Sequence, residues 1–452
     1  MDKSTTFKTN LILVLFHLAL GVLLLIGFVS KIVSVTVALF GILYIIKSKN
    51  KNNEAMFLAA YMVGTEVLYR MSGGMLLYEL PKYSVLIFLI LGLYVEKKRH
   101  HVSISYLIYI LLLLIGIAFV NIPFNESIRK AIAFNLSGPV LLGISAIYFY
   151  KRQLSIHQLL NMLFFMGLPI ISMLSLLYFK TPDIKEIVFG GGANFDTSGG
   201  YGPNQVSTIL GMGVFIVAIH FVFKKRIFPL FVMDVLLFMY LIYRGLITLS
   251  RGGMLTAFIA LVAFMFFYLL ARKDTVNQLF KYVGIVMFFG VILVLYTADA
   301  TGGMLINRYT NKNAAGVAKN DFSTGRIALF EGELDNFYEH PFFGIGVGGS
   351  KYHRLEEEGI VAASHNEVSR LLSEHGMIGL VILLLLIAIP TKHILSQPYL
   401  ARAFLSAFLL FWFLTINHSA MRIAFPAFIY GLSLVVITFK EPEDSKGHEK
   451  FL

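Results

Sequence analysis

The stretch AASHNEVSRLLSEHGMIGL (362–380) passes from small polar residues into an apolar segment that continues to about residue 391. Membrane helices rarely carry ionisable groups close to the bilayer unless those groups have a partner or a function. His365, Asn366, Glu367, Arg370 and Glu374 stand directly before this apolar segment. Their position raises the question of what they do there.

Composition places the chain among membrane proteins. Of its 452 residues, 57% are hydrophobic and 14% are charged, whereas a soluble domain has about 25% charged residues. Apolar runs long enough to cross a bilayer recur along the sequence. We therefore predict an all-α integral membrane protein with about 14 transmembrane helices and a large, partly helical extracytoplasmic loop. The predicted spans are 10–29, 32–46, 55–72, 83–95, 104–121, 131–150, 157–178, 204–223, 227–243, 253–271, 279–297, 377–391, 401–418 and 423–439.

Basic residues in short loops predict the orientation of these spans. If the spans are counted as above, these basic loops and both termini lie on the same side of the membrane. That side is predicted to be the cytoplasm. These loops are 47–54, 96–101, 150–153, 224–226, 271–281 and 392–400. The net charge of +12 is thus explained by topology and not by nucleic acid. The first span follows Lys3 and Lys8 like a signal peptide, but it has no cleavage site, so we expect it to be retained.

Four regions follow from this reading. They are an N-terminal multi-span region (1–190), central spans (191–297), an extracytoplasmic catalytic loop (298–376), and C-terminal spans with a cytoplasmic tail (377–452). Residues 190–204, GGGANFDTSGGYGPN, predict a mobile loop that leads into a helix at Pro203. Residues 323–340 carry apolar side chains at helical spacing, with Ser323 as a candidate cap and Pro341 beyond the end.

Arginines stand at two notable places on the outer side. TLSRGGML (248–255) puts Arg251 at the mouth between two spans, and STGRIAL (323–329) puts Arg326 in the first turn of the loop helix. A guanidinium grips phosphate through two parallel hydrogen bonds and keeps its charge. A cation at a helix N-terminus is disfavoured, so Arg326 suggests a compensating anion. An ordinary interfacial role remains open for Arg251.

Several other motifs do not meet the requirements of the sites they resemble. GIGVGG (344–349) lacks the strand–helix context of a dinucleotide loop, and it predicts a turn that passes close to a ligand or a helix. HNE (365–367) lacks the paired cysteines of a zinc deaminase, because the chain has no cysteine. His340, His353, His365 and His375 show no H-E-x-x-H spacing. We expect no metal site and no cofactor; a metal site built from ligands far apart in the sequence stays open.

Five motifs follow one another in the second half of the chain: SRGG at a membrane edge, GR at the start of a helix, HPFFGIGVGG, SHN, and LLSEHGMIGL at the start of a span. Taken together, they resemble the superfamily of O-antigen ligases and O-antigen polymerases. The resemblance is concentrated in residues 248–380. It implies a metal-independent, inverting glycosyltransferase that uses undecaprenyl-pyrophosphate-linked glycan at the outer face of the cytoplasmic membrane. It also implies that His365 is the catalytic residue and that Arg251 and Arg326 bind pyrophosphate.

Further residues have weaker support as substrate ligands. Arg244, Arg308 and Arg70 are candidate phosphate ligands, and Asn366 either orients His365 or binds a sugar hydroxyl. A histidine is suited to accept the proton of an attacking hydroxyl near neutral pH. Either Glu367 or Glu374 is expected to hold its second ring nitrogen. Arg354 and the acidic run 356–358 are expected to form either a solvated face or a contact with the glycan acceptor.

Three functions remain open at this point. A polymerase joins lipid-linked repeat units of O-antigen, capsule or exopolysaccharide, and a ligase moves finished glycan to a lipid A core or another acceptor. The number of predicted spans favours the polymerase. A lipid or glycan transporter predicts ionisable groups at mid-membrane, where only Glu66 and Asp234 stand out. The expected partners are the glycan donor and acceptor, membrane lipids and a chain-length regulator protein.

Overall fold

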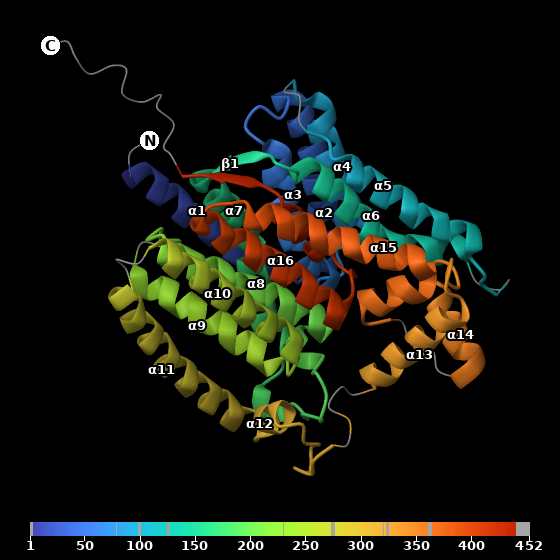
Figure 1. Ribbon diagram of the computed structural model, residues 1–452. Helices are drawn as coiled ribbons and strands as arrows, with labels where there is room; N and C mark the ends of the chain where they lie inside the picture. Colours follow the sequence, from blue (N-terminus) through green and yellow to red (C-terminus); the bar gives the residue numbers. More distant parts are fainter. Residues whose placement is uncertain are drawn as a thin grey trace.

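The computed structural model describes residues 3–77, 79–97, 101–123, 127–228, 230–272, 276–319, 321, 325–359 and 364–439. These residues form 17 α-helices and a two-stranded parallel sheet, β1–β2 (Figure 1). The first half contains α1 Lys3–Leu23, α2 Gly27–Ser48, α3 Glu54–Met71, α4 Leu80–Val95, α5 Ile104–Ile115, α6 Ile128–Phe149, β1 Gln153–Ser155, α7 Ile156–Lys180 and α8 Pro203–Val222. The second half contains α9 Phe231–Ile247, α10 Arg251–Ala271, α11 Val276–Ala300, α12 Met304–Tyr309, α13 Arg326–Glu339, α14 Gly349–Glu358, α15 Glu367–Leu395, α16 Tyr399–Ser419, α17 Ala424–Leu432 and β2 Val436–Thr438.

The prediction of an all-α, multi-pass membrane protein is confirmed. Among the described residues, seven helices are long and apolar enough to cross a membrane: α2, α6, α7, α8, α10, α15 and α16. Several shorter apolar helices stand beside them. The last predicted span, 423–439, is wrong as a continuous helix, because α17 ends at Leu432 and the chain continues as the extended strand β2.

The outer surface of the bundle is apolar. Phe28, Leu43, Leu111 and Phe258 are all more than half exposed, although they are large hydrophobic side chains. Soluble proteins rarely expose contiguous apolar patches of this kind. Lipid chains are the environment in which such side chains are stable, so the exposed faces of α1, α2, α5 and α10 are membrane-facing.

Small residues allow α10 to pack closely in the centre of the bundle. It lies between α8 and α16. A Cβ at Gly253 would lie 2.3 Å from the carbonyl carbon of Ser207 on α8, and one at Gly252 would lie 2.4 Å from the ring of His418 on α16. The two glycines of SRGG are therefore required by helix contacts and bring α10 directly against both neighbours.

One end of the bundle gathers the basic loops. Strand β1 pairs with β2 in parallel, with Gln153 opposite Val436. Arg152 forms a salt bridge with Glu96, 3.1 Å between Nη2 and Oε2, and His393 Nε2 lies 3.0 Å from the carbonyl oxygen of Val435. Loops that are far apart in the sequence therefore meet at one end, as the topology prediction requires.

The opposite end carries α12, α13, α14 and the glycine-rich loop (Figure 1). The predicted helix at 323–340 is confirmed as α13, which begins at Arg326 and ends before Pro341. Its proposed cap, Ser323, and the tail 440–452 lie outside the described residues. Within the glycine-rich loop, Thr197 and Ser198 are fully buried, so this part of the loop packs against the bundle; the mobility of the loop stays a prediction.

Candidate functional site

His365 immediately precedes the first turn of α15. Asn366 caps this helix, and its side-chain oxygen accepts hydrogen bonds from the backbone amides of Val368 (2.8 Å) and Ser369 (3.3 Å). Its amide nitrogen donates to Asn417 Oδ1 at 3.1 Å. The cap fixes the start of α15 and the position of the histidine before it. Asn366 thus has a structural role that the sequence did not indicate.

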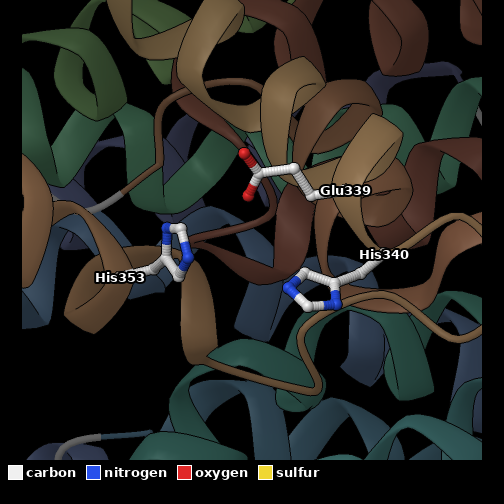
Figure 2. A group of neighbouring side chains, drawn as sticks. All are labelled: Glu339, His340 and His353. Atoms are coloured by element: carbon white, nitrogen blue, oxygen red, sulfur yellow. The ribbon is translucent and has the colours of Figure 1, made fainter.

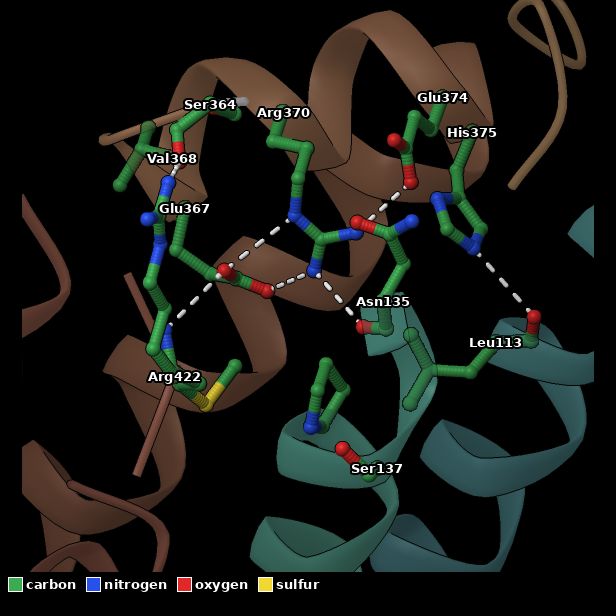
Figure 3. A network of polar contacts seen from close by, with 12 residues as sticks. Leu113, Asn135, Ser137, Ser364, Glu367, Val368, Arg370, Glu374, His375 and Arg422 are labelled. Carbon is green, nitrogen blue, oxygen red and sulfur yellow. Dashed lines mark hydrogen bonds and ion pairs between the residues drawn. The ribbon is translucent and has the colours of Figure 1, made fainter. Parts of the chain in front are cut away.

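The charged residues of the first two turns of α15 pair with one another (Figure 3). Arg370 donates to Glu367 and, at 2.7 Å, to Glu374, and all three side chains are buried. A third hydrogen bond from Arg370 reaches the carbonyl oxygen of Asn135 on α6 at 3.2 Å. The expectation that Glu367 or Glu374 holds the ring of His365 is therefore wrong. Both carboxylates neutralise Arg370, because a buried charge is stable only when it is paired.

The turn at 344–349 packs against a kink in α15. Gly376 has φ 59° and ψ −137°, which interrupts the helix, and the amide of Met377 donates to the carbonyl oxygen of Pro341 at 2.7 Å. Gly344 has φ 68°, and a Cβ there would lie 2.5 Å from the amide nitrogen of His375. The structure confirms that this motif is a close-approach turn against a helix.

Arg422 belongs to the site, although the sequence reading did not select it. It lies between α16 and α17, and its Nη2 donates to the carbonyl oxygen of Ser364 at 2.7 Å. Two carboxylates hold its loop. Glu66 accepts a hydrogen bond from the amide of Ala424 at 2.5 Å, and Glu367 accepts one from the amide of Met421 at 3.4 Å. The predicted topology puts the loop at 419–422 on the outer side. This placement is the feature of the sequence that could have marked Arg422 as a candidate.

Arg251 and Arg308 lie together at the junction of α10 and α12. Arg251 Nη1 donates to the carbonyl oxygen of Arg308 at 3.1 Å, and Arg308 Nε donates to that of Leu249 at 3.2 Å. A small apolar cluster that includes Leu249 and Leu305 holds α12 in place. Arg308 Nη1 also reaches the carbonyl oxygen of Gly191, 3.3 Å away in the glycine-rich loop.

The charges around these arginines are positive. Burial and the neighbouring Arg251 and Arg326 lower the pKa of Arg308 to about 10. Burial, Arg251 and Arg422 likewise lower the pKa of Arg326. Within the described part of the chain, the Arg326 side chain forms no hydrogen bond or ion pair. Arginines that repel one another in a partly buried position favour the binding of an anion.

His365 lies beside this group of arginines. Burial, followed in order by the charges of Arg422, Arg326, Arg354 and His418, lowers its pKa to about 4. Its imidazole is therefore neutral at pH 7 and able to accept a proton. It forms no hydrogen bond with the described residues, so its ring nitrogens remain available to a substrate.

Arg354 is not on a solvated face, as one reading of the sequence suggested. It is 3% exposed and pairs with the buried Glu333 at 2.7 Å. Burial raises the pKa of Glu333, although hydrogen bonds from Ser369 and the charge of Arg354 oppose this shift. Glu333 thereby joins α13 to α14 and α15. The side chains of the acidic run 356–358 lie outside the described residues.

The two remaining candidate arginines lie elsewhere. Arg244 donates to Thr181 Oγ1 at 2.6 Å and to the carbonyl oxygen of Thr197 at 3.0 Å, so it supports the glycine-rich loop. Arg70 is buried in ion pairs with Glu66 and Glu79. The structure thus brings together His365, Arg251, Arg308 and Arg326, but not Arg244 and Arg70.

The mid-membrane carboxylates that a transporter would use have structural partners. Glu66 binds Arg70 and the amide of Ala424. Asp234 accepts hydrogen bonds from the amides of Ile227 at 3.3 Å and Phe228 at 2.8 Å. Both carboxylates fix loops, at opposite ends of the bundle, so a structural role accounts for each of them.

Residues 236–384 match the family model described as O-Antigen ligase. The matched segment contains Arg251, Arg308, Arg326 and His365. It ends before Arg422, which comes to the same site from outside the segment. No curated protein and no solved structure matches the chain.

Proposed function

We propose that the protein polymerises glycan repeat units carried on a polyprenyl pyrophosphate at the outer face of the cytoplasmic membrane. The premise is the match of residues 236–384 to the family model described as O-Antigen ligase. The observation that carries the proposal is the convergence of a neutral His365 with Arg251, Arg308, Arg326 and Arg422. Such a site combines a proton acceptor with cations that bind a diphosphate.

The reaction is a displacement at the anomeric carbon of the donor sugar. An acceptor hydroxyl oxygen forms the new bond to this carbon while its proton passes to His365. The bond from the carbon to the pyrophosphate oxygen breaks, and that oxygen keeps the electron pair. The guanidinium groups stabilise the charge that develops on the leaving pyrophosphate. His365 later releases its proton to solvent, and attack from the side opposite the leaving group inverts the configuration.

Arg422 and Arg326 have complementary places in this reaction. Arg326 presents a guanidinium without a protein partner in the described residues, and its positive neighbours favour an anion. Arg422 is anchored to Ser364 and stands next to His365. We assign both to pyrophosphate binding, together with Arg251 and Arg308. Arg244 and Arg70 act in supporting the fold.

Substitution of the base and of one phosphate ligand tests the assignment. We expect His365→Ala to lower turnover about 10²–10⁴-fold with little change in donor affinity, because general-base catalysis contributes about that factor. Arg326→Lys keeps the charge but loses the paired geometry, so donor affinity and turnover should fall about tenfold or more. Reconstituted enzyme with a lipid-linked donor gives both quantities.

His157→Ala and Arg129→Lys are the matched controls, since both residues are exposed and outside the site. All variants are compared at equal abundance in the membrane. If His365→Ala turned over at the wild-type rate, His365 would not be the catalytic base. An unaltered Arg326→Lys would reduce that residue to a general positive charge.

A ligase reaction uses the same site with a different acceptor, and it is the second candidate because the matched family is described as ligase. Surface glycan from a deletion strain separates the two. A polymerase defect leaves single repeat units and no long chains. A ligase defect leaves long chains on the lipid carrier.

A further inference from the structure

Glu339, His340 and His353 form a compact group at the outer end of the molecule (Figure 2). One ligand atom of each side chain lies within 4.8 Å of those of the other two. Glu339 and His340 are exposed and His353 is partly buried. The group lies at the C-terminal end of α13 and in the middle of α14, and it shares no residue with the proposed catalytic site.

The end of α13 makes this convergence possible. Consecutive residues of a helix point in directions about 100° apart and do not face one another. Glu339 is the last residue of α13, and His340 has left the helix with φ −122° and ψ 61°. The following turn is closed by a hydrogen bond of 3.0 Å from the amide of Gly344 to the carbonyl oxygen of His340. His353 reaches the same point from the middle of α14.

We propose that Glu339, His340 and His353 bind one divalent transition-metal ion of the zinc type, with water completing the coordination. Two imidazoles and one carboxylate are typical of zinc and its first-row neighbours, whereas magnesium and calcium prefer oxygen ligands. Ligand atoms around tetrahedral zinc are about 3.4 Å apart, given bonds of about 2.1 Å. Glu339 and His340 are exposed, and rotation of their side chains is the movement that closes the remaining distance.

The ion joins α13 to α14. These helices already share the salt bridge between Glu333 and Arg354, and His353 directly precedes Arg354 in the chain. A second connection at Glu339 and His340 holds the middle of α14 at two points along α13. The ion therefore stabilises the outer loop. The inference does not depend on the proposed function.

Binding is tested on the full-length protein in detergent, purified through a tag without histidine and stripped with a chelating resin. Zn²⁺ binding is measured by competition with a chromophoric chelator. We expect wild type to bind one equivalent more tightly than His340→Ala and His353→Ala by at least about tenfold, since even loss of a supporting group around a metal costs 10–100-fold. His157→Ala, an exposed histidine outside the group, should bind like wild type.

Hydrogen exchange supplies a second readout that does not require activity. Zn²⁺ should slow amide exchange at 349–359 in wild type and in His157→Ala, but not in the double variant His340→Ala/His353→Ala. The exchange pattern of the metal-free double variant should match that of metal-free wild type, which shows that it is folded. Equal Zn²⁺ affinity of the double variant and wild type would overturn the proposal. So would an exchange rate at 349–359 that Zn²⁺ leaves unchanged.

Discussion

His365 occupies an environment that keeps its imidazole uncharged. Burial and four neighbouring cationic or basic groups all lower its pKa, which is about 4 instead of the ordinary 6.5. A base with so low a pKa is always available but is weak. On the proposed function, a bound pyrophosphate adds negative charge beside the same arginines, and we expect it to raise the pKa of His365. Donor binding is then expected to strengthen the base.

The pH dependence of kcat/KM tests this arrangement, because it reports the free enzyme. Only neutral His365 accepts a proton, so activity should be constant near neutral pH and fall as the pH drops through about 4. Arg422→Gln removes a charge that lowers this pKa, so its acid limb should move to higher pH. Arg129→Gln, which changes an exposed arginine, should leave the limb in place. Two results would contradict the described environment of His365. One is a loss of wild-type activity centred near pH 6.5, and the other is an acid limb of the pH profile that Arg422→Gln does not move.

At the scale of the element, α10 shows why SRGG combines an arginine with two glycines. Arg251 opens the helix at the site, and the glycines after it allow α8 and α16 to approach. Ser207 Oγ donates to the carbonyl oxygen of Ser250 at 2.9 Å across the same contact. The close packing of α10 and the position of Arg251 therefore depend on one another within the four residues of SRGG.

Gly253→Ala should destabilise the protein by about 1–3 kcal/mol, the usual cost of overpacking. The added methyl group would lie 2.3 Å from the backbone of Ser207, so α8 and α10 must separate. Thermal unfolding in detergent and the folded yield measure the effect. Gly290→Ala on α11 is the matched control, because a Cβ there meets nothing within 4 Å and alanine favours a helix. Equal unfolding temperatures for the two variants would show that the α8–α10 contact tolerates expansion.

The whole molecule has two chemically different ends. The basic loops, β1 and β2 meet at one end, while α12, α13, α14 and the site lie at the other (Figure 1). A distribution of lysine and arginine of this kind orients membrane proteins with the basic loops in the cytoplasm. We therefore expect the site to face outwards, where lipid-linked glycans are joined.

Cysteine labelling tests this orientation on a chain that has no cysteine of its own. Ala315→Cys and Lys51→Cys place single thiols at exposed positions near opposite ends of the bundle. A membrane-impermeant maleimide should label Ala315→Cys in intact cells and Lys51→Cys only after the cells are opened. The reverse pattern would invert the topology and place the proposed site in the cytoplasm.

The sequence by itself determined the membrane class and most helix positions, and it supplied several residues of the proposed site. These features depend on local patterns: apolar runs of membrane length, helical periodicity in 323–340, and the SRGG and SHN motifs. Arg251, Arg326 and His365 could be selected in this way. The structure of the last predicted span could not be predicted in this way, because the apolar composition of 423–439 does not distinguish a helix from a helix followed by a strand.

Only the tertiary structure decided which polar groups meet. Arg422 joins His365 because Glu66 and Glu367 hold the loop between α16 and α17, and Glu66 is more than 350 residues away from that loop in sequence. Glu367 and Glu374 bind Arg370 rather than His365, since a buried arginine requires counter-charges. Glu339, His340 and His353 converge because α13 ends between the first two. Local periodicity carries no information about such contacts, which depend on how helices pack and on the need to pair every buried charge.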